Sequence, residues 1–111
     1  MKRYCLALDL VNDNALIAEY EQFHKKIWPE IYRSIKESGI ENMEIYRIGN
    51  RLYMIMETLE TFSFENKSKM DSENAFVQKW EALMWKYQQA LPMANKGEKW
   101  LLMDKIFDLN N

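Results

Sequence analysis

One residue of this 111-residue sequence, His24, is better suited than any other to move protons near neutral pH. An unperturbed imidazole has a pKa of about 6.5, so it can both accept and release a proton under physiological conditions. His24 lies among apolar and aromatic side chains in the segment from Tyr20 to Glu30. In a helix, Tyr20 would lie one turn from His24, so a phenol and an imidazole would be neighbours. This pair predicts a small acid–base site.

A second interpretation of the same histidine is structural. The apolar positions around it repeat at intervals of three and four, which is typical of one face of a buried helix. That stripe consists of Leu16, Tyr20, Phe23, His24, Ile27 and Ile31. A lone histidine on such a face is often a core residue held by a hydrogen bond. The spacing alone therefore leaves catalysis and packing both open.

Composition limits the classes of protein to consider. With 48% hydrophobic residues and well-mixed charges, the chain is expected to fold as one domain over residues 1–111. The net charge of −2 argues against a nucleic-acid partner, since phosphate binding needs a clustered basic surface. No apolar run reaches membrane-spanning length, and the N-terminus lacks a signal-peptide pattern. We therefore expect a cytoplasmic protein without nucleic-acid or membrane partners.

Cofactor chemistry has little support in the sequence. One histidine and one cysteine are too few for a typical transition-metal site, so no metal is expected. The three glycines stand at predicted turns, and none belongs to a glycine-rich phosphate loop. Cofactor-free proton transfer by His24 remains, with phenols or carboxylates as candidate partners. Four carboxylates on predicted strands could project toward a pocket, but the sequence favours solvated or ion-paired residues, namely Asp9, Glu44, Glu57 and Asp104.

Three strands and a broken helix are predicted in the first half of the chain. The strands have alternating side chains and cover Lys2–Val11, Ile40–Ile48 and Arg51–Leu59. Gly49 and Asn50 form a turn signal that predicts a hairpin of the last two. A helical pattern from Ala15 to Ile27 should be interrupted at Pro29 and continue to Ser38.

The second half is predicted to contain one long helix and one strand. Thr61 or Ser63 opens a polar helical turn, and Ser72 with Glu73 can cap the following helix. That helix is expected to run from Glu73 to about Leu91, where Pro92 stops it. A final strand is expected from Trp100 to Leu109, with alternating apolar residues.

The order of these elements is strand, helix, strand, strand, helix, strand. This βαββαβ order predicts a ferredoxin-like α+β sandwich, with a four-stranded antiparallel sheet and the helices on one face. The other face would carry large apolar side chains that need cover. A second copy packed sheet to sheet would bury them, so we expect a homodimer in the form of a dimeric α/β barrel.

The residues also resemble a known family. The segment Tyr20-x-x-x-His24-x-x-Ile27-Trp28-Pro29-Glu30 is similar to the signature of the L-rhamnose mutarotases. Shorter matching pieces follow in the same order, namely Gln78-Lys79-Trp80, Trp85-Lys86-Tyr87, Leu91-Pro92 and Ile106-Phe107-x-Leu109. The resemblance covers essentially the whole chain. It implies a cytoplasmic homodimer that interconverts the α and β anomers of L-rhamnose without metal or nucleotide, and some relatives are thought to prefer L-fucose.

The resemblance assigns roles to individual residues. His24 matches the family's proton donor, Tyr20 a sugar-contacting tyrosine, and Trp80 the first residue of a substrate-contacting tryptophan pair. Glu81 stands where that pair has its second tryptophan, and Met43 where the family has a further tyrosine. These departures leave the reaction type unchanged and the choice of sugar open. Met43 or Trp28 could provide an apolar niche for the methyl group of a 6-deoxyhexose.

Mutarotation gives these residues a chemical task. A proton leaves the anomeric hydroxyl and another reaches the ring oxygen, and general acid–base catalysis by one imidazole typically contributes about 10²–10⁴-fold. The leading prediction is therefore an isomerase acting on L-rhamnose, with L-fucose as the close alternative. From other classes, a cofactor-free oxygenase on a dimeric ferredoxin-like barrel and a small-ligand binding protein without turnover remain alternatives.

Overall fold

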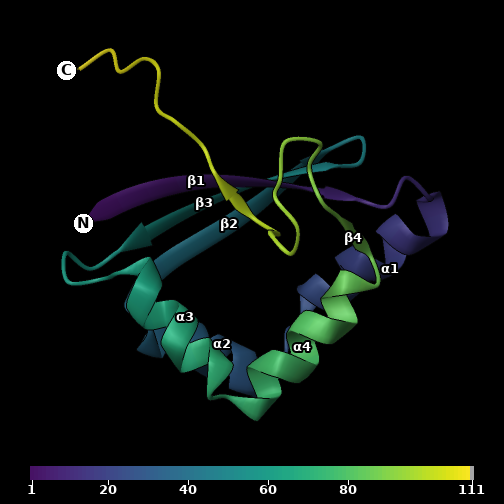
Figure 1. Ribbon diagram of the computed structural model, residues 1–111, viewed down its shortest axis with the longest axis horizontal. Coiled ribbons are helices and arrows are strands. Elements are labelled where there is room, and N and C mark those ends of the chain that lie inside the picture. Colours follow the sequence, from purple (N-terminus) through teal and green to yellow (C-terminus); the bar gives the residue numbers. More distant parts are fainter. Residues whose placement is uncertain (111) are drawn as a thin grey trace.

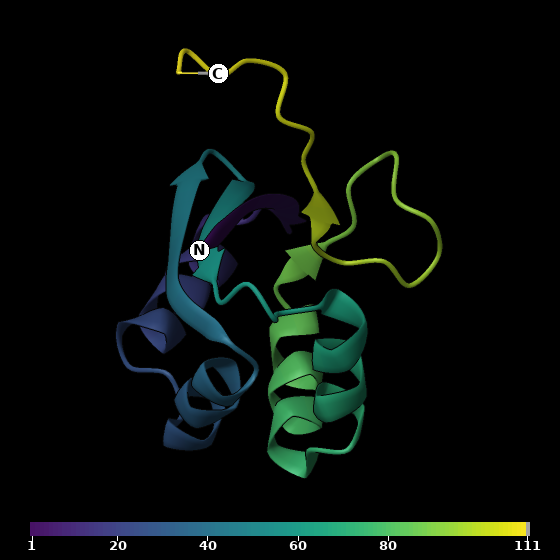
Figure 2. The same ribbon diagram turned by 90° about the vertical axis from the view of Figure 1, so that its left-hand side faces the viewer.

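One antiparallel sheet forms a layer of the structure, and four helices form a second layer on one of its faces (Figures 1 and 2). The structure is a computed structural model and describes residues 1–110. Its strands are β1 (Lys2–Leu10), β2 (Ile40–Ile48), β3 (Arg51–Thr58), β4 (Gln88–Gln89) and β5 (Leu101–Leu102). Its helices are α1 (Asn14–Lys25), α2 (Pro29–Glu37), α3 (Phe64–Ser72) and α4 (Ala75–Trp85).

The sheet has the order β2-β3-β1-β4, and β5 pairs with β1 beside β4. Leu6 lies opposite Met54 and Leu8 opposite Leu52, so the buried side chains of β1 and β3 share the face that the helices cover. Strand residues alternate between the two faces, which explains why every second residue of β3 is buried. This order agrees with the predicted ferredoxin-like arrangement.

The interruption predicted at Pro29 separates two helices. Helix α1 begins after Asp13, whose carboxylate accepts a hydrogen bond of 3.0 Å from the Leu16 amide, and it ends at Lys25 rather than Ile27. Pro29 is the first residue of α2, where its missing amide proton does no harm. Gly39 follows α2 with φ +99°, a backbone conformation that glycine adopts without a steric penalty.

Helix α4 is shorter than the sequence predicts. It begins after Asn74, not Ser72 or Glu73, because the Asn74 side chain accepts hydrogen bonds from the amides of Phe76 and Val77. It ends at Trp85 instead of Leu91. The Val11 amide donates a hydrogen bond of 2.8 Å to the Tyr87 carbonyl, and Gln88–Gln89 then follows the edge of β1 as strand β4.

The predicted strand from Trp100 to Leu109 is wrong over most of its length. Only Leu101–Leu102 pairs with β1, and the last backbone contact there joins the Met103 amide to the Cys5 carbonyl at 2.8 Å. Beyond that bond the chain leaves the sheet on the side away from the helices (Figures 1 and 2). Ile106, Phe107 and Leu109 are 95%, 75% and 82% exposed. The alternating apolar residues predict a strand. They form none here because no other strand in the described part of the chain lies beside them to pair with.

The core lies between the sheet and the helices in two clusters. One is centred on residues of α1, α4 and β1, including Tyr20 and Trp80, and the other on β3 with Ile40 and Phe62. Ile35, Ile45 and Trp100 pack against both clusters. None of the helices in residues 1–110 is long and apolar enough to cross a membrane.

Candidate active site

A cavity of about 630 Å³ opens between the covered face of the sheet and the helices. Figure 2 shows the arrangement that creates it, with α1 and α2 beneath one half of the sheet and α3 and α4 beneath the other. Five of the six predicted site residues line this cavity, namely Tyr20, His24, Met43, Trp80 and Glu81. The sixth, Trp28, is absent from the lining and instead packs against Trp80, with ring centroids 5.0 Å apart.

The hydrogen bond of His24 defines its tautomer. Its Nδ1 lies 2.8 Å from the Tyr20 carbonyl oxygen, one turn earlier in α1. A carbonyl oxygen only accepts, so Nδ1 carries the proton and donates it. Burial lowers the pKa of His24 from 6.5 and outweighs this hydrogen bond, which acts in the opposite direction. The imidazole is therefore neutral at pH 7, and its Nε2 has a free lone pair that can accept a proton.

Aromatic rings enclose His24 on two sides. The Tyr20 ring centroid is 4.3 Å from that of His24, and the Trp80 centroid is 5.6 Å away. Tyr20 is only 3% exposed, and this burial is the main reason why its pKa rises to about 12. A hydrogen bond from Gln88 opposes the rise, and the negative charge of Glu81 adds to it. The phenol therefore keeps its proton and can act as a hydrogen-bond donor.

The helices bring these rings together for simple reasons. Tyr20 and His24 are four residues apart in α1 and so share one face of the helix. Trp80 is on α4, where Val77, Trp80 and Met84 form its buried face. The two helices therefore present an imidazole, a phenol and an indole to one cavity.

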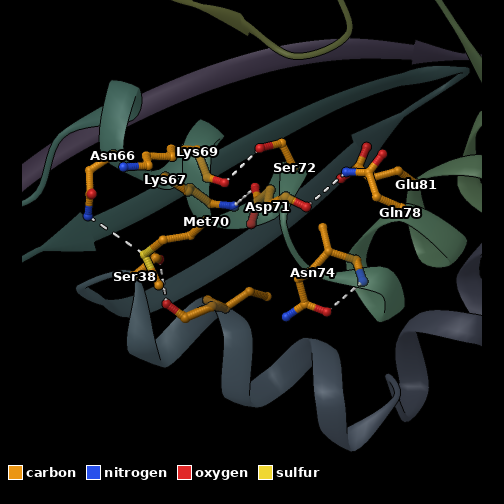
Figure 3. A network of polar contacts seen from close by, with 12 residues as sticks. Ser38, Asn66, Lys67, Lys69, Met70, Asp71, Ser72, Asn74, Gln78 and Glu81 are labelled. Carbon is orange, nitrogen blue, oxygen red and sulfur yellow. Dashed lines mark hydrogen bonds and ion pairs between the residues drawn. The ribbon is translucent and has the colours of Figure 1, made fainter.

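Charged pairs form another part of the lining. Glu81 accepts a hydrogen bond of 2.8 Å from the Lys99 ammonium group, and Asp71 forms an ion pair of 2.6 Å with Lys67. In Figure 3, Gln78 reaches back along α4 toward the backbone of Asp71, and Lys67 points at the Asp71 carboxylate. Glu81 thus lines the cavity as predicted, but Lys99 already neutralises its charge.

Met43 lies on β2, on the face of the sheet that the helices cover. It packs at the edge of the core cluster that contains Met54 and Met56. A second hollow of about 1140 Å³, between α2 and β2, shares His24 and Met43 with the cavity described above. Met43 therefore separates two adjoining spaces near the imidazole, in a position suited to contact a small apolar group.

Most of the lining residues do not figure among the predicted site residues. Those that could form polar or aromatic contacts with a ligand include Lys67, Asp71, Gln88, Lys99 and Trp100. Trp100 stands in the predicted last strand and Gln88 in the predicted long helix, where nothing in the pattern points to a cavity. The lysines and Asp71 lie in polar segments that are typical of solvated surfaces. No group of three or more His, Cys, Asp or Glu side chains within residues 1–110 is arranged to hold a metal ion.

Comparison with solved structures defines the fold class. An L-rhamnose mutarotase from Formosa agariphila matches with a TM-score of 0.72 at 18% identity, over 98% of this chain and 99% of that one. A dimeric ferredoxin-like protein from an uncultured marine organism matches with a TM-score of 0.52 at 12% identity, over 78% and 76% of the two chains. These similarities confirm the predicted ferredoxin-like α+β fold.

Sequence comparison identifies the family. A model described as L-rhamnose mutarotase matches residues 3–109, and the chain therefore belongs to the L-rhamnose mutarotase family. An L-fucose mutarotase from Xanthomonas campestris pv. campestris is 44% identical over 99% of this chain and 90% of its own length. An L-rhamnose mutarotase from Oceanobacillus iheyensis is 30% identical over 72% of this chain and 71% of its own length. The protein is thus a sugar mutarotase, an isomerase.

Proposed function

We propose that this mutarotase acts on L-fucose, with L-rhamnose as a poorer substrate. The observation that carries the proposal is the 44% identity to an L-fucose mutarotase along nearly the whole chain, against 30% over a shorter part for an L-rhamnose mutarotase. We therefore replace L-rhamnose, the substrate that the sequence predicts first, by L-fucose, which it predicts as the alternative. Both sugars are 6-deoxyhexoses, so the chemistry expected of the site does not change.

The charged part of the cavity offers a way to distinguish the two sugars. L-Fucose and L-rhamnose have the same methyl group and differ in the configuration of the hydroxyls at C2 and C4. A site separates them by where it places hydrogen-bonding groups, because an unpaired buried hydroxyl weakens binding. Glu81 and Lys99 offer a carboxylate and an ammonium group where the family has a flat tryptophan face. We infer that they contact one of the differing hydroxyls.

The aromatic part carries the proton chemistry in this proposal. Nε2 of His24 takes the proton of the anomeric hydroxyl, the bond between C1 and the ring oxygen breaks, and the imidazolium gives that proton to the ring oxygen. Tyr20 holds the ring oxygen by a hydrogen bond throughout, and the product is the open-chain aldehyde. The bond between C1 and C2 then rotates, and closure on the other carbonyl face returns the proton and gives the second anomer. The Trp80 ring stacks on the C–H face of the sugar. Met43, with Trp28 behind Trp80, provides the apolar niche for the methyl group.

Saturation-transfer NMR tests the substrate assignment directly. With catalytic amounts of the protein, saturation of one anomeric proton signal of L-fucose should pass to the other signal. L-Rhamnose at the same concentration should exchange more slowly, and D-glucose provides the control for unspecific acid–base catalysis. Faster exchange of L-rhamnose than of L-fucose would reverse the proposal. Binding of either sugar without exchange would point to a binding protein instead.

We further propose that two copies of this chain form a homodimer through the open face of the sheet. Tyr46 and Ile48 on this face are more than half exposed, and the run after β5 presents Ile106, Phe107 and Leu109 to solvent. Several large, exposed apolar or aromatic side chains are typical of a surface that contacts another protein chain. A second copy would bury them and give the run after β5 a strand to pair with.

Analytical ultracentrifugation tests the dimer. The chain has a mass of 13.4 kDa, so a dimer sediments as a particle of twice that mass. Phe107→Asp with Ile106→Asp should shift the population toward monomer, because burying two carboxylates in the interface is unfavourable. Asp104→Asn, in the same exposed run, is the matched control and should leave the dimer intact. A monomeric wild-type chain would refute the assembly.

A further inference from the structure

A buried amide next to Tyr20 has no role in the chemistry described so far. Gln88 is 8% exposed, lines the cavity, and comes directly after the turn that follows α4. Its backbone pairs with Leu10 of the central strand, and the preceding residue, Tyr87, accepts a hydrogen bond from the Val11 amide. The sheet therefore holds this side chain in a fixed place beside the cavity.

The nitrogen and the oxygen of the Gln88 amide differ in their hydrogen bonding. Nε2 of Gln88 donates to the hydroxyl oxygen of Tyr20 at 3.4 Å. Oε1 has no hydrogen-bond partner although it is buried, and in residues 1–110 no other side-chain oxygen or nitrogen is in that state. An unpaired buried oxygen destabilises a fold, whereas an aliphatic side chain of similar length would avoid the problem. Packing alone thus gives no reason for glutamine here, and the contact with Tyr20 does.

This contact determines which way the phenol can donate. A phenolic oxygen has one proton to give and lone pairs that accept. When Gln88 donates to that oxygen, the amide occupies a lone pair and the phenolic proton remains free for another acceptor. Tyr20 also lines the cavity, next to the imidazole of His24. A sugar oxygen in the cavity is then the natural acceptor.

We propose that Gln88 is a positioning residue, which holds the Tyr20 hydroxyl so that its proton points at the ring oxygen of the bound sugar. The expected effect of Gln88 on catalysis rests on the proposed function. The contact between the amide and the phenol is a property of the free protein. Gln88 touches no reacting atom in this scheme and acts through Tyr20.

A double-mutant cycle tests the proposal. Gln88→Met keeps the length of the side chain and removes the amide, Tyr20→Phe removes the hydroxyl, and the third variant carries both changes. Gln88→Met should lower kcat by about tenfold to 10²-fold with little change in KM, as expected when a group near the reacting atoms loses its orientation. The double variant should be no slower than Tyr20→Phe alone, because Gln88 has nothing left to orient.

The matched control is Gln89→Met, on the next residue of the same short strand, whose side chain is exposed. It should keep the kcat of the wild-type chain. A folded Gln88→Met variant with unchanged kcat would overturn the proposal. So would a double variant whose loss equals the product of the two single losses, since Gln88 would then act independently of Tyr20. If Gln88→Met does not fold, Gln88→Glu replaces it and should also lower kcat, because its carboxylate accepts the phenolic proton.

A second measurement separates this inference from the proposed function. With ¹³C-labelled tyrosine, the Cζ signal of Tyr20 in the sugar-free protein reports on hydrogen bonding at its oxygen. Gln88→Met should shift that signal and Gln89→Met should not. If the wild-type chain exchanges the anomers of neither sugar, the proposed function fails, yet this shift would still support the contact. An unmoved Cζ signal would overturn the positioning role whatever the activity.

Discussion

The two sides of the cavity differ in the kind of side chain that they present. The aromatic side, from α1 and the buried face of α4, contains Tyr20, His24 and Trp80, whose rings pack against one another. The charged side, from α3, α4 and the approach to β5, contains the ion pairs of Lys67 with Asp71 and of Lys99 with Glu81. Both sides border one cavity, so a bound sugar would meet both.

This difference suggests a division of labour. Burial shifts the pKa values of His24 and Tyr20 and so keeps one neutral and the other protonated, which proton transfer requires. The charged side chains are more exposed and can exchange water for sugar hydroxyls at a smaller energetic penalty. The aromatic side is therefore expected to determine the rate, and the charged side to determine which sugar binds. Four experiments test this division, and they follow in order of expected effect.

Replacement of His24 should have the largest effect. His24→Ala removes the lone pair of Nε2, and kcat should fall by about 10²–10⁴-fold, the usual contribution of one general acid–base group. Lys25→Ala, at the next and exposed position of α1, is the control and should keep full activity. Saturation transfer between the anomeric signals of L-fucose measures both. An active His24→Ala variant would show that the imidazole has only a structural role.

A change on the charged side should alter the choice of sugar more than the rate. Glu81→Trp restores the family's pair of tryptophans, and the ratio of kcat/KM for L-fucose to that for L-rhamnose should fall by about tenfold. Glu81→Gln removes the charge and keeps the size, so it separates electrostatic from steric effects. Competition between the two sugars in one NMR sample measures the ratio. An unchanged ratio with a much lower kcat would place Glu81 in the rate-determining chemistry instead.

Near neutral pH, the pH dependence of kcat/KM should reflect the protonation of His24 alone. Because burial lowers its pKa, the imidazole remains a base below pH 6.5, and kcat/KM should fall only at more acidic values. The unfolded chain takes up that proton at pH 6.5, so the free energy of unfolding should decrease as the pH drops through this value. Tyr20, with its pKa of about 12, should cause no loss below pH 10. An acid limb centred above pH 6.5 would contradict a pKa of His24 that burial lowers.

The smallest effect is expected from the ion pair on α3. Lys67→Met breaks the contact with Asp71, and the free energy of unfolding should change by about 1 kcal/mol, because the pair lies within one helix and keeps partial access to water. KM for L-fucose should rise severalfold if this pair contacts the sugar, while kcat stays near the wild-type value. Lys36→Met breaks the comparable pair with Glu41 outside the cavity of about 630 Å³ and is the control. Equal KM values for both variants would limit sugar recognition to Glu81 and Lys99.

The aromatic side could be predicted from the sequence because its geometry is mostly local. Tyr20 and His24 share a helix face by virtue of a spacing of four. The hairpin with Gly49, at φ +57°, and the break at Pro29 are also local signals. Each depends on backbone preferences of a few neighbouring residues, which a sequence reveals directly.

The charged side and the edge of the sheet could not be predicted in the same way. Gln88 and Gln89 show no alternation, and they form β4 only because the edge of β1 is available to them. Lys99 meets Glu81 across 18 residues of chain, a contact that depends on how the loop before β5 folds. Phe107 and Leu109 follow the alternation of a strand, but no strand of residues 1–110 lies beside them to pair with. In all three cases, contacts between residues far apart in the sequence determine the structure, and local secondary-structure propensity does not.

The bond from Nδ1 of His24 to the Tyr20 carbonyl has a consequence for how such proteins can diversify. Both partners belong to one turn of one helix, so the tautomer of the imidazole is set by secondary structure and does not depend on residues elsewhere in the cavity. Residues on α3 or the loops could then be exchanged to admit a different deoxyhexose without changing which nitrogen accepts the proton. When the reactive residues lie within one helical turn, substitutions during evolution can change the sugar that binds while the reaction stays the same.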